Sequence, residues 1–253
     1  MSESPVCRYR ATVEYDGTDF LGYQIQAAGR TVQGEIEASL QKITQSFVRI
    51  DGAGRTDAGV HATGQVIAFN VAWRHSLTEL HRALNATLPR DIVIRTLTTT
   101  DRDFHPRFGA LSRTYRYQII NQRWPSVMQQ RYAYHIERSL DVEAMNIASR
   151  YLIGSHDFAS FGKPPQGENT VRRVTQAEWL VEAGNRIVFE ITANAFLYRM
   201  VRNIVGTMVQ VGSGQLLPDD VQQILLAKNL KLSAAPAPAH GLCLVNVTYP
   251  DST

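Results

Sequence analysis

Apolar residues recur along the first hundred positions at two spacings, which predict strands and helices in a regular order. Alternation of apolar and polar residues predicts strands over residues 7–15, 47–50, 65–71 and 92–97. Apolar positions three and four residues apart predict helices over 31–45 and from Ser76, which has the capping-box spacing to Glu79. The resulting order, β-α-β-β-α-β, is that of a ferredoxin-like fold.

The second half repeats this order of elements without residue-level identity to the first half. Strands are predicted over residues 114–120, 174–181, 186–193 and 242–249, and helices over 140–152, 198–211 and 221–228. The strands 174–181 and 186–193 are expected to form a hairpin around Gly184-Asn185. We therefore predict an α+β fold with two ferredoxin-like (RRM-like) halves, residues 1–105 and 106–253. They are expected to form one extended, mostly antiparallel sheet with helices on one face and a cleft for a large ligand.

Composition narrows the class of protein further. The chain has 253 residues, 44% apolar and 19% charged, as in soluble globular proteins, and no apolar run approaches the roughly 18 residues of a membrane span. Residues 1–5 lack the basic and apolar parts of a signal peptide, so we expect no membrane association and a cytoplasmic protein. Cys7 and Cys243 are expected to be buried thiols, and no Cys or His cluster has the spacing of a metal site.

Charge is distributed unevenly along the chain. The net charge is only +3, and 22 of the 26 basic residues are Arg. Residues 95–138 contain eight Arg but only three acidic residues, and four Tyr and one Trp lie among them: Tyr115, Tyr117, Trp124, Tyr132 and Tyr134. Cations interleaved with stacking surfaces are typical of nucleic-acid binding, although codon bias alone explains the Arg-to-Lys ratio equally well.

A charged, glycine-rich loop separates the predicted strands 47–50 and 65–71. Its sequence is Gly54-Arg55-Thr56-Asp57-Ala58-Gly59-Val60-His61. The connection is longer than an ordinary turn of two to five residues. These residues alone fit two interpretations: an Asx-type turn with a solvated Arg, which is the commoner case, or a ligand site built on Asp57.

Two residues elsewhere could complete such a site. Arg202 falls at the edge of the apolar stripe of the predicted helix 198–211, where an Arg either extends to solvent or pairs with an anionic group. Tyr115 and Tyr117 share one face of their predicted strand, so each could be a core residue or a stacking platform for a base.

The loop resembles the signature of the TruA-type tRNA pseudouridine synthases, and the resemblance runs nearly from end to end. Further matching blocks follow in the family's order: Glu14-Tyr15-Asp16-Gly17, Asn85-Ala86-Thr87-Leu88-Pro89, Asp103-Phe104-His105-Pro106-Arg107-Phe108, Arg113-Thr114-Tyr115-Arg116-Tyr117, Asp157-Phe158-Ala159-Ser160-Phe161, Asn194-Ala195-Phe196, Met200-Val201-Arg202-Asn203-Ile204-Val205-Gly206, and Ala235-Pro236-Ala237-Pro238-Ala239 before Gly241-Leu242. The chain departs from the family in two places: Tyr23 stands where Trp is common, and residues 162–170 differ in length and content.

The resemblance implies a role for each matching residue. Asp57 corresponds to the essential aspartate, Arg55 to the arginine that helps extrude the target nucleotide, Tyr115 to the tyrosine that stacks on the flipped base, and Arg202 to the arginine that pairs with the catalytic carboxylate. Arg107, Arg113 and Arg116 in the basic segment are further candidates for RNA binding. The cleft of the predicted fold would then bind RNA.

The same resemblance implies an activity. The family isomerises uridine to pseudouridine at positions 38, 39 and 40 of the tRNA anticodon stem-loop, as a homodimer and without a cofactor or metal. Asp57 would attack the ribose, remove a ribose proton or add to the base, and the sequence does not choose among these. The alternative is a non-catalytic RNA-binding module of tandem ferredoxin-like units, which leaves Asp57 without a role.

Overall fold

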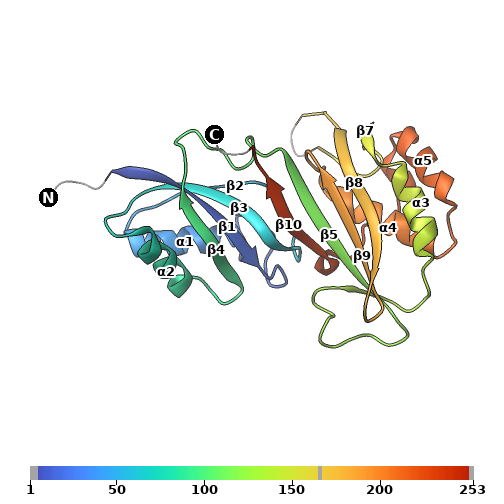
Figure 1. Ribbon diagram of the computed structural model, residues 1–253, viewed down its shortest axis with the longest axis horizontal. Helices are drawn as coiled ribbons and strands as arrows, with labels where there is room; N and C mark the ends of the chain where they lie inside the picture. Colours follow the sequence, from blue (N-terminus) through green and yellow to red (C-terminus); the bar gives the residue numbers. More distant parts are fainter. Residues whose placement is uncertain (1–4, 165–166, 251–253) are drawn as a thin grey trace. The chain divides into compact units, whose positions relative to one another are not determined.

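The computed structural model describes residues 5–164 and 167–250 and has the mostly antiparallel α+β fold expected from the sequence (Figure 1). Two compact units form: unit 1 comprises residues 5–111 and 244–250, and unit 2 comprises 112–164 and 167–243. Residues 1–4, on which part of the localisation prediction rests, and residues 165–166 of the loop 162–170 lie outside the described residues. Each unit is considered separately.

Unit 1 has the predicted β-α-β-β-α-β order. Its antiparallel sheet has the strand order β4-β1-β3-β2, the ferredoxin-like arrangement. The elements are β1 (Val6–Tyr15), α1 (Val32–Thr44), β2 (Ile50–Gly52), β3 (His61–Ala72), α2 (Leu77–Thr87) and β4 (Ile92–Thr99).

The helices of unit 1 begin at side-chain caps and bury one apolar face each. Thr31 Oγ1 accepts a hydrogen bond from Gly34 N at the start of α1. Ser76 and Glu79 form the predicted capping box at the start of α2. The apolar residues that predicted these helices, such as Ile36 in α1 and Leu84 in α2, are fully buried, which holds both helices in the core.

Two boundaries in unit 1 differ from the sequence prediction. The strand predicted over residues 47–50 is wrong for its first three residues, because pairing with β3 begins at Ile50 and continues to Gly52. Phe47, whose apolar side chain suggested a strand, is 63% exposed. Strand β3 begins at His61 rather than Gln65, so the last residue of the glycine-rich loop belongs to the sheet.

In unit 2 the strands pair in the order β5-β9-β8-β7, each antiparallel to the next, and β6 pairs parallel to β5. The elements are β5 (Ser112–Asn121), β6 (Tyr134–Ile136), α3 (Val142–Arg150), β7 (Gly154–Asp157), β8 (Val171–Glu182), β9 (Arg186–Ala193), α4 (Met200–Gly212), α5 (Pro218–Ala227) and the 3₁₀ turns Leu230–Leu232 and Ala239–Gly241. Strand β10 (Leu242–Thr248) begins in unit 2 and ends in unit 1. The short strands β6 and β7 were not predicted, because three or four residues give no readable alternation.

The core of unit 2 is rich in large side chains. Trp179 and Phe189, on paired strands, stack with their ring centroids 4.6 Å apart. The predicted hairpin between these strands turns at Gly184 and Asn185, which both have positive φ, as tight hairpin turns require.

Asp157, the last residue of β7, links three segments of unit 2. Its Oδ1 accepts hydrogen bonds from Thr170 Oγ1 (2.5 Å) and Ala159 N (3.1 Å), and its Oδ2 lies 3.3 Å from Lys228 Nζ. The hydrogen bond from Thr170, with smaller contributions from Ala159 and Lys228, lowers the pKa of Asp157 from its ordinary value, against the opposing effect of burial.

This lowered pKa predicts an acid-sensitive contribution to stability. A carboxylate with a lowered folded-state pKa stabilises the fold above its unfolded pKa, and the effect is lost as the pH falls through the folded value. Wild type should therefore unfold at a higher temperature than Asp157→Asn from about pH 7 to pH 5, and the gap should shrink below about pH 4. Thermal unfolding, monitored by circular dichroism at each pH, measures the difference in unfolding temperature between the two proteins. A gap that stays constant down to about pH 3 would contradict the assignment.

Candidate active site

Asp57 lies in a tight turn between β2 and β3 of unit 1. Val60 N donates a hydrogen bond to Asp57 O (3.1 Å), which closes the turn Asp57–Val60. Gly59, the third turn residue, has a φ of +76°, the left-handed conformation that favours glycine at this position. The Asp57 side chain is half-buried. We call this segment the Asp57 turn.

The residue before Asp57 is fixed by the connection between β1 and α1. Thr56 is buried, and its Oγ1 lies 2.8 Å from Tyr15 Oη, while its carbonyl accepts a hydrogen bond from Tyr23 N (3.1 Å). A Cβ on Gly22, whose φ is +107°, would lie 2.9 Å from Thr56 O. This close backbone approach requires glycine at position 22 and positions the start of the Asp57 turn.

The same connection holds the other end of the turn. A Cβ on Gly17 would come within 2.1 Å of Val60 O, so the two backbones touch there. The adjacent His61 is buried, with its Nδ1 3.0 Å from Gly17 N and 3.1 Å from Asp16 Oδ1. The sequence pattern marked residues 14–17 as a family block but assigned them no role. The structure shows that this block supports the Asp57 turn.

Arg55 combines a fixed backbone with an exposed side chain. Its neighbour Gly54 accepts a hydrogen bond from Gln65 Nε2 through its carbonyl oxygen (2.9 Å). Within the described part of the chain, the Arg55 guanidinium has no hydrogen-bond or ion-pair partner. Arg55 is therefore available to a ligand, two positions from Asp57.

Tyr115 and Tyr117 lie on the same buried face of β5 in unit 2, as predicted from the alternation. Tyr115 is 8% exposed, and its ring meets Phe196 edge to face with centroids 5.0 Å apart. Tyr117 is fully buried and donates its hydroxyl hydrogen to Pro238 O (2.9 Å), and burial raises its pKa above the ordinary value. Tyr117 is thus a core residue.

Arg202 lies in the first turn of α4 and is joined to the segment Ala235–Ala239 of the same unit. Arg202 Nε donates to Ala237 O (2.8 Å), and Ala237 N donates in return to Arg202 O (2.9 Å). Gly206, one turn further along α4, allows this approach, because a Cβ there would lie 2.2 Å from Ala235 O. The two reciprocal hydrogen bonds orient the guanidinium of Arg202.

The three other arginine candidates differ in their surroundings. Arg116 pairs with Glu182 (2.6 Å) and lies 3.6 Å from Glu190, and Arg113 donates to Asn194 O (2.8 Å). Arg107, in unit 1, lies over the Phe108 ring at 5.6 Å. The structure therefore gives Arg113 and Arg116 partners inside unit 2, while their contact with RNA stays a prediction.

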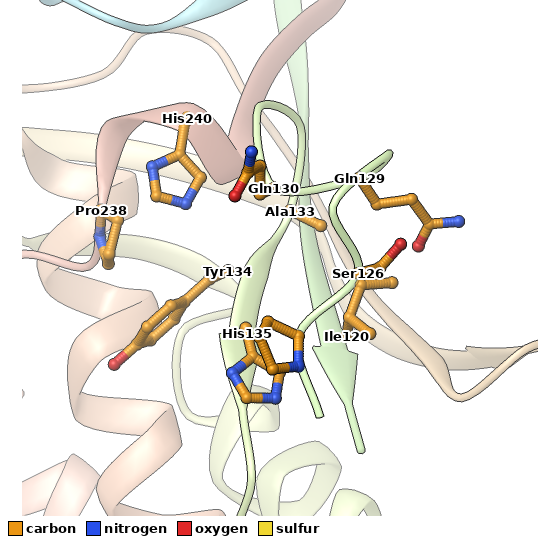
Figure 2. Close-up of a pocket in the computed structure, with 10 residues that line it drawn as sticks. Ile120, Ser126, Gln129, Gln130, Ala133, Tyr134, His135, Pro238 and His240 are labelled. Atoms are coloured by element: carbon orange, nitrogen blue, oxygen red, sulfur yellow. The ribbon is translucent and has the colours of Figure 1, made fainter. Parts of the chain in front are cut away.

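A pocket of about 390 Å³ opens in unit 2, lined by residues of the segment 120–135 together with Pro238 and His240 (Figure 2). Figure 2 shows Tyr134, His135 and His240 around it. The same segment exposes Trp124, 70% accessible, with the Arg123 guanidinium 5.0 Å from its ring. Trp124 and Arg123 belong to the basic segment 95–138, for which the sequence predicted nucleic-acid binding.

Two features are absent from the residues that the structure describes, a metal-binding cluster and a membrane-spanning helix. Those residues contain no group of three or more His, Cys, Asp or Glu side chains arranged to hold a metal ion. No helix of the described chain is long and apolar enough to cross a membrane.

Comparison with known proteins identifies the class. The family model described as tRNA pseudouridine synthase matches residues 11–109 and 148–250, so the chain belongs to that family. It is 42% identical to the tRNA pseudouridine synthase A of Bacillus licheniformis over 96% of this chain and 99% of that protein. The protein of the same name from Roseiflexus castenholzii is 46% identical over 94% and 89% of the two chains.

Two buried tyrosines beside the Asp57 turn give a matched stability test. Tyr15 has the hydroxyl partner Thr56, whereas the Tyr23 hydroxyl has no hydrogen-bond partner within the described residues, and Tyr23 is only 4% exposed. Burial is the main cause that raises the pKa of Tyr23 well above its ordinary value.

Tyr23→Phe should raise the free energy of unfolding by about 1 kcal/mol, because it removes a buried hydroxyl without a partner. Tyr15→Phe should lower the free energy of unfolding by about 1 kcal/mol, because this substitution removes a buried hydroxyl that has a hydrogen-bond partner. Urea denaturation of both variants measures the two effects. Equal destabilisation by the two substitutions would show that the Tyr23 hydroxyl is satisfied in solution.

Proposed function

We propose that this protein isomerises uridine to pseudouridine at positions 38, 39 and 40 of the tRNA anticodon stem-loop, with Asp57 as the catalytic carboxylate. Membership of the tRNA pseudouridine synthase family across both units is the observation that carries the proposal. The geometry of the Asp57 turn supports it, because a rigid backbone presents a half-buried carboxylate.

The reaction sets the demands on the site. The bond between ribose and the base nitrogen breaks, and the same ribose carbon bonds to carbon 5 of the base. The hydrogen of carbon 5 leaves as a proton, and the freed base nitrogen takes up a proton. The reaction uses no second substrate, and nothing is oxidised overall. A carboxylate can attack the ribose, remove a ribose proton or add to the base, and each route requires a carboxylate that is held in a fixed position.

The target uridine must leave its helical stack before reaction. Unstacking costs a few kcal/mol, which aromatic stacking on the base can offset. We assign this stacking to Tyr115 and the extrusion of the nucleotide to Arg55, whose side chain is exposed. Arg202 is assigned as the partner of the catalytic carboxylate, because it matches the family's arginine and its guanidinium is oriented by Ala237 O.

The central test uses Asp57→Asn and tRNA labelled with tritium at carbon 5 of uridine. Wild type should release label to water, and Asp57→Asn should release none while binding tRNA within about threefold of wild type, since one uncharged replacement preserves the shape of the turn. Asp219→Asn, at an exposed aspartate on α5 of unit 2 and outside the basic segment 95–138, is the control and should react normally. Label release by Asp57→Asn at the wild-type rate would remove Asp57 from its role.

The same assay separates the alternative of a non-catalytic RNA-binding module, which would bind tRNA and release no label. Substrates with a single uridine at position 38, 39 or 40 test the proposed positions. Conversion confined to uridines outside the anticodon stem-loop would contradict the proposed specificity.

The basic segment 95–138 is proposed as an RNA-binding surface. Arg123 and Arg131 are exposed in it, and the Arg123 guanidinium lies 5.0 Å from the Trp124 ring. Binding of tRNA should weaken steeply with salt, because arginines that bind phosphates release counterions. The slope of log K against log salt should flatten by about one unit for each such arginine that is replaced.

Arg123→Gln and Arg131→Gln should each flatten this slope, whereas Arg82→Gln, an exposed arginine on α2 outside the segment, should not. Filter binding of tRNA over a series of salt concentrations measures the slope for wild type and for each variant. Equal slopes for all four proteins would place the RNA elsewhere.

We also propose that the protein is a cytoplasmic homodimer, as the family resemblance implies. Sedimentation equilibrium tests the assembly, and a monomer at micromolar concentration would contradict it.

A further inference from the structure

His61 connects the end of the Asp57 turn to the chain that supports it. It is the first residue of β3 and directly follows Val60, whose N–H closes the turn onto Asp57 O. It is 6% exposed, so its ring is held in a fixed place. Nδ1 lies 3.0 Å from Gly17 N and 3.1 Å from Asp16 Oδ1.

These two neighbours serve the two protonation states of the ring. When Nδ1 carries no proton, it accepts the hydrogen of Gly17 N–H. When Nδ1 is protonated, it donates to the Asp16 carboxylate. The ring therefore has a partner in residues 16–17 in either form.

Residues 16 and 17 are themselves well anchored. Asp16 N donates to Asp91 O (3.0 Å), and Asp16 Oδ1 accepts hydrogen bonds from Thr18 N (3.0 Å) and Thr18 Oγ1 (2.6 Å). Gly17 in turn touches Val60 O, where a Cβ would come within 2.1 Å. A ring bonded to this anchored pair is thus fixed relative to the Asp57 turn.

The contact matters because the far end of the turn has weaker support than the near end. At the near end Thr56 is held by Tyr15 Oη at 2.8 Å and Tyr23 N at 3.1 Å. At the far end another link to the same connection, from Gly59 N to Phe20 O, is 3.4 Å long. His61 supplies a shorter link there.

We propose that His61 is a positioning residue for the reaction: through Nδ1 it holds the 16–17 segment against Val60 and so fixes the Asp57 carboxylate. The inference rests on the proposed function of Asp57. A displacement of the reacting group by about 1 Å can lower a rate by about 100-fold, so loss of this link should slow the chemical step more than it weakens tRNA binding.

Two polar substitutions test the proposal. In His61→Asn the side-chain oxygen is attached to Cγ, as Nδ1 is, and can accept from Gly17 N–H. In His61→Gln the oxygen lies one bond further out and misses that position. His81→Leu is the control. His81 lies on α2 of the same unit, and its ring is also hydrogen-bonded to a backbone group, the carbonyl of Ile94.

Single-turnover label release and tRNA binding are measured for each variant, well below its unfolding temperature. His61→Asn should react within about threefold of wild type and His61→Gln at least about tenfold more slowly, with dissociation constants for tRNA within about twofold. His81→Leu should react normally. Equal rates for the Asn and Gln variants, whether both fast or both slow, would overturn the positioning role.

The label-release assay distinguishes a failure of the proposed role of His61 from a failure of the proposed function. Inactive Asp57→Asn with wild-type rates for both His61 variants refutes only the role of His61. An active Asp57→Asn would remove Asp57 from its role and with it the basis of this inference, and a wild type that releases no label would refute the proposed function itself. A role of His61 in stability alone would lower the unfolding temperature of His61→Gln without changing its single-turnover rate.

Discussion

The site in unit 1 depends on one close approach between two backbones, the connection from β1 to α1 and the Asp57 turn. Side chains at Gly17 and Gly22 would collide with Val60 O and Thr56 O, so the approach is possible only without a Cβ at those positions. Hydrogen bonds from Tyr15 and Tyr23 then fix the distance. A loop, ordinarily the mobile part of a fold, is thereby as constrained as the strands on either side of it.

The candidate arginines of the two units are held to different degrees. Arg202 donates from Nε to a backbone carbonyl, and Arg116 is bound between two glutamates, so their orientations are set by the protein. Arg55 and Arg123 extend from the surface. A guanidinium that is already oriented can act on a ligand with little loss of side-chain entropy, whereas an extended one can follow a nucleotide as it moves.

Much of the fold was predictable from local signals, because those signals act within a few residues. The capping box at Ser76 placed α2, and the pair Gly184-Asn185 placed the hairpin between β8 and β9. Phe47 misled the prediction, since an apolar residue that stays exposed has the same sequence signal as one that is buried. The short strand β7 gave no signal at all.

The helical stripe and the strand alternation singled out Arg202 and Tyr115, and the family motifs supplied their roles. The contacts that support the candidate residues were not predicted. The hydrogen bond between Gly17 N and His61 Nδ1 and the ion pair of Arg116 with Glu182 join residues far apart in the chain, so no local pattern reveals them.

The contact of the segment Ala235–Ala239 with α4 also joins residues far apart in the chain, and the sequence of the segment limits how it can form. Pro236 and Pro238 have no N–H, so Ala237 provides the sole backbone donor between them, and a slip by one residue would put a proline opposite Arg202 O. The alternation of alanine and proline thus excludes a shift by one residue where this segment docks on α4.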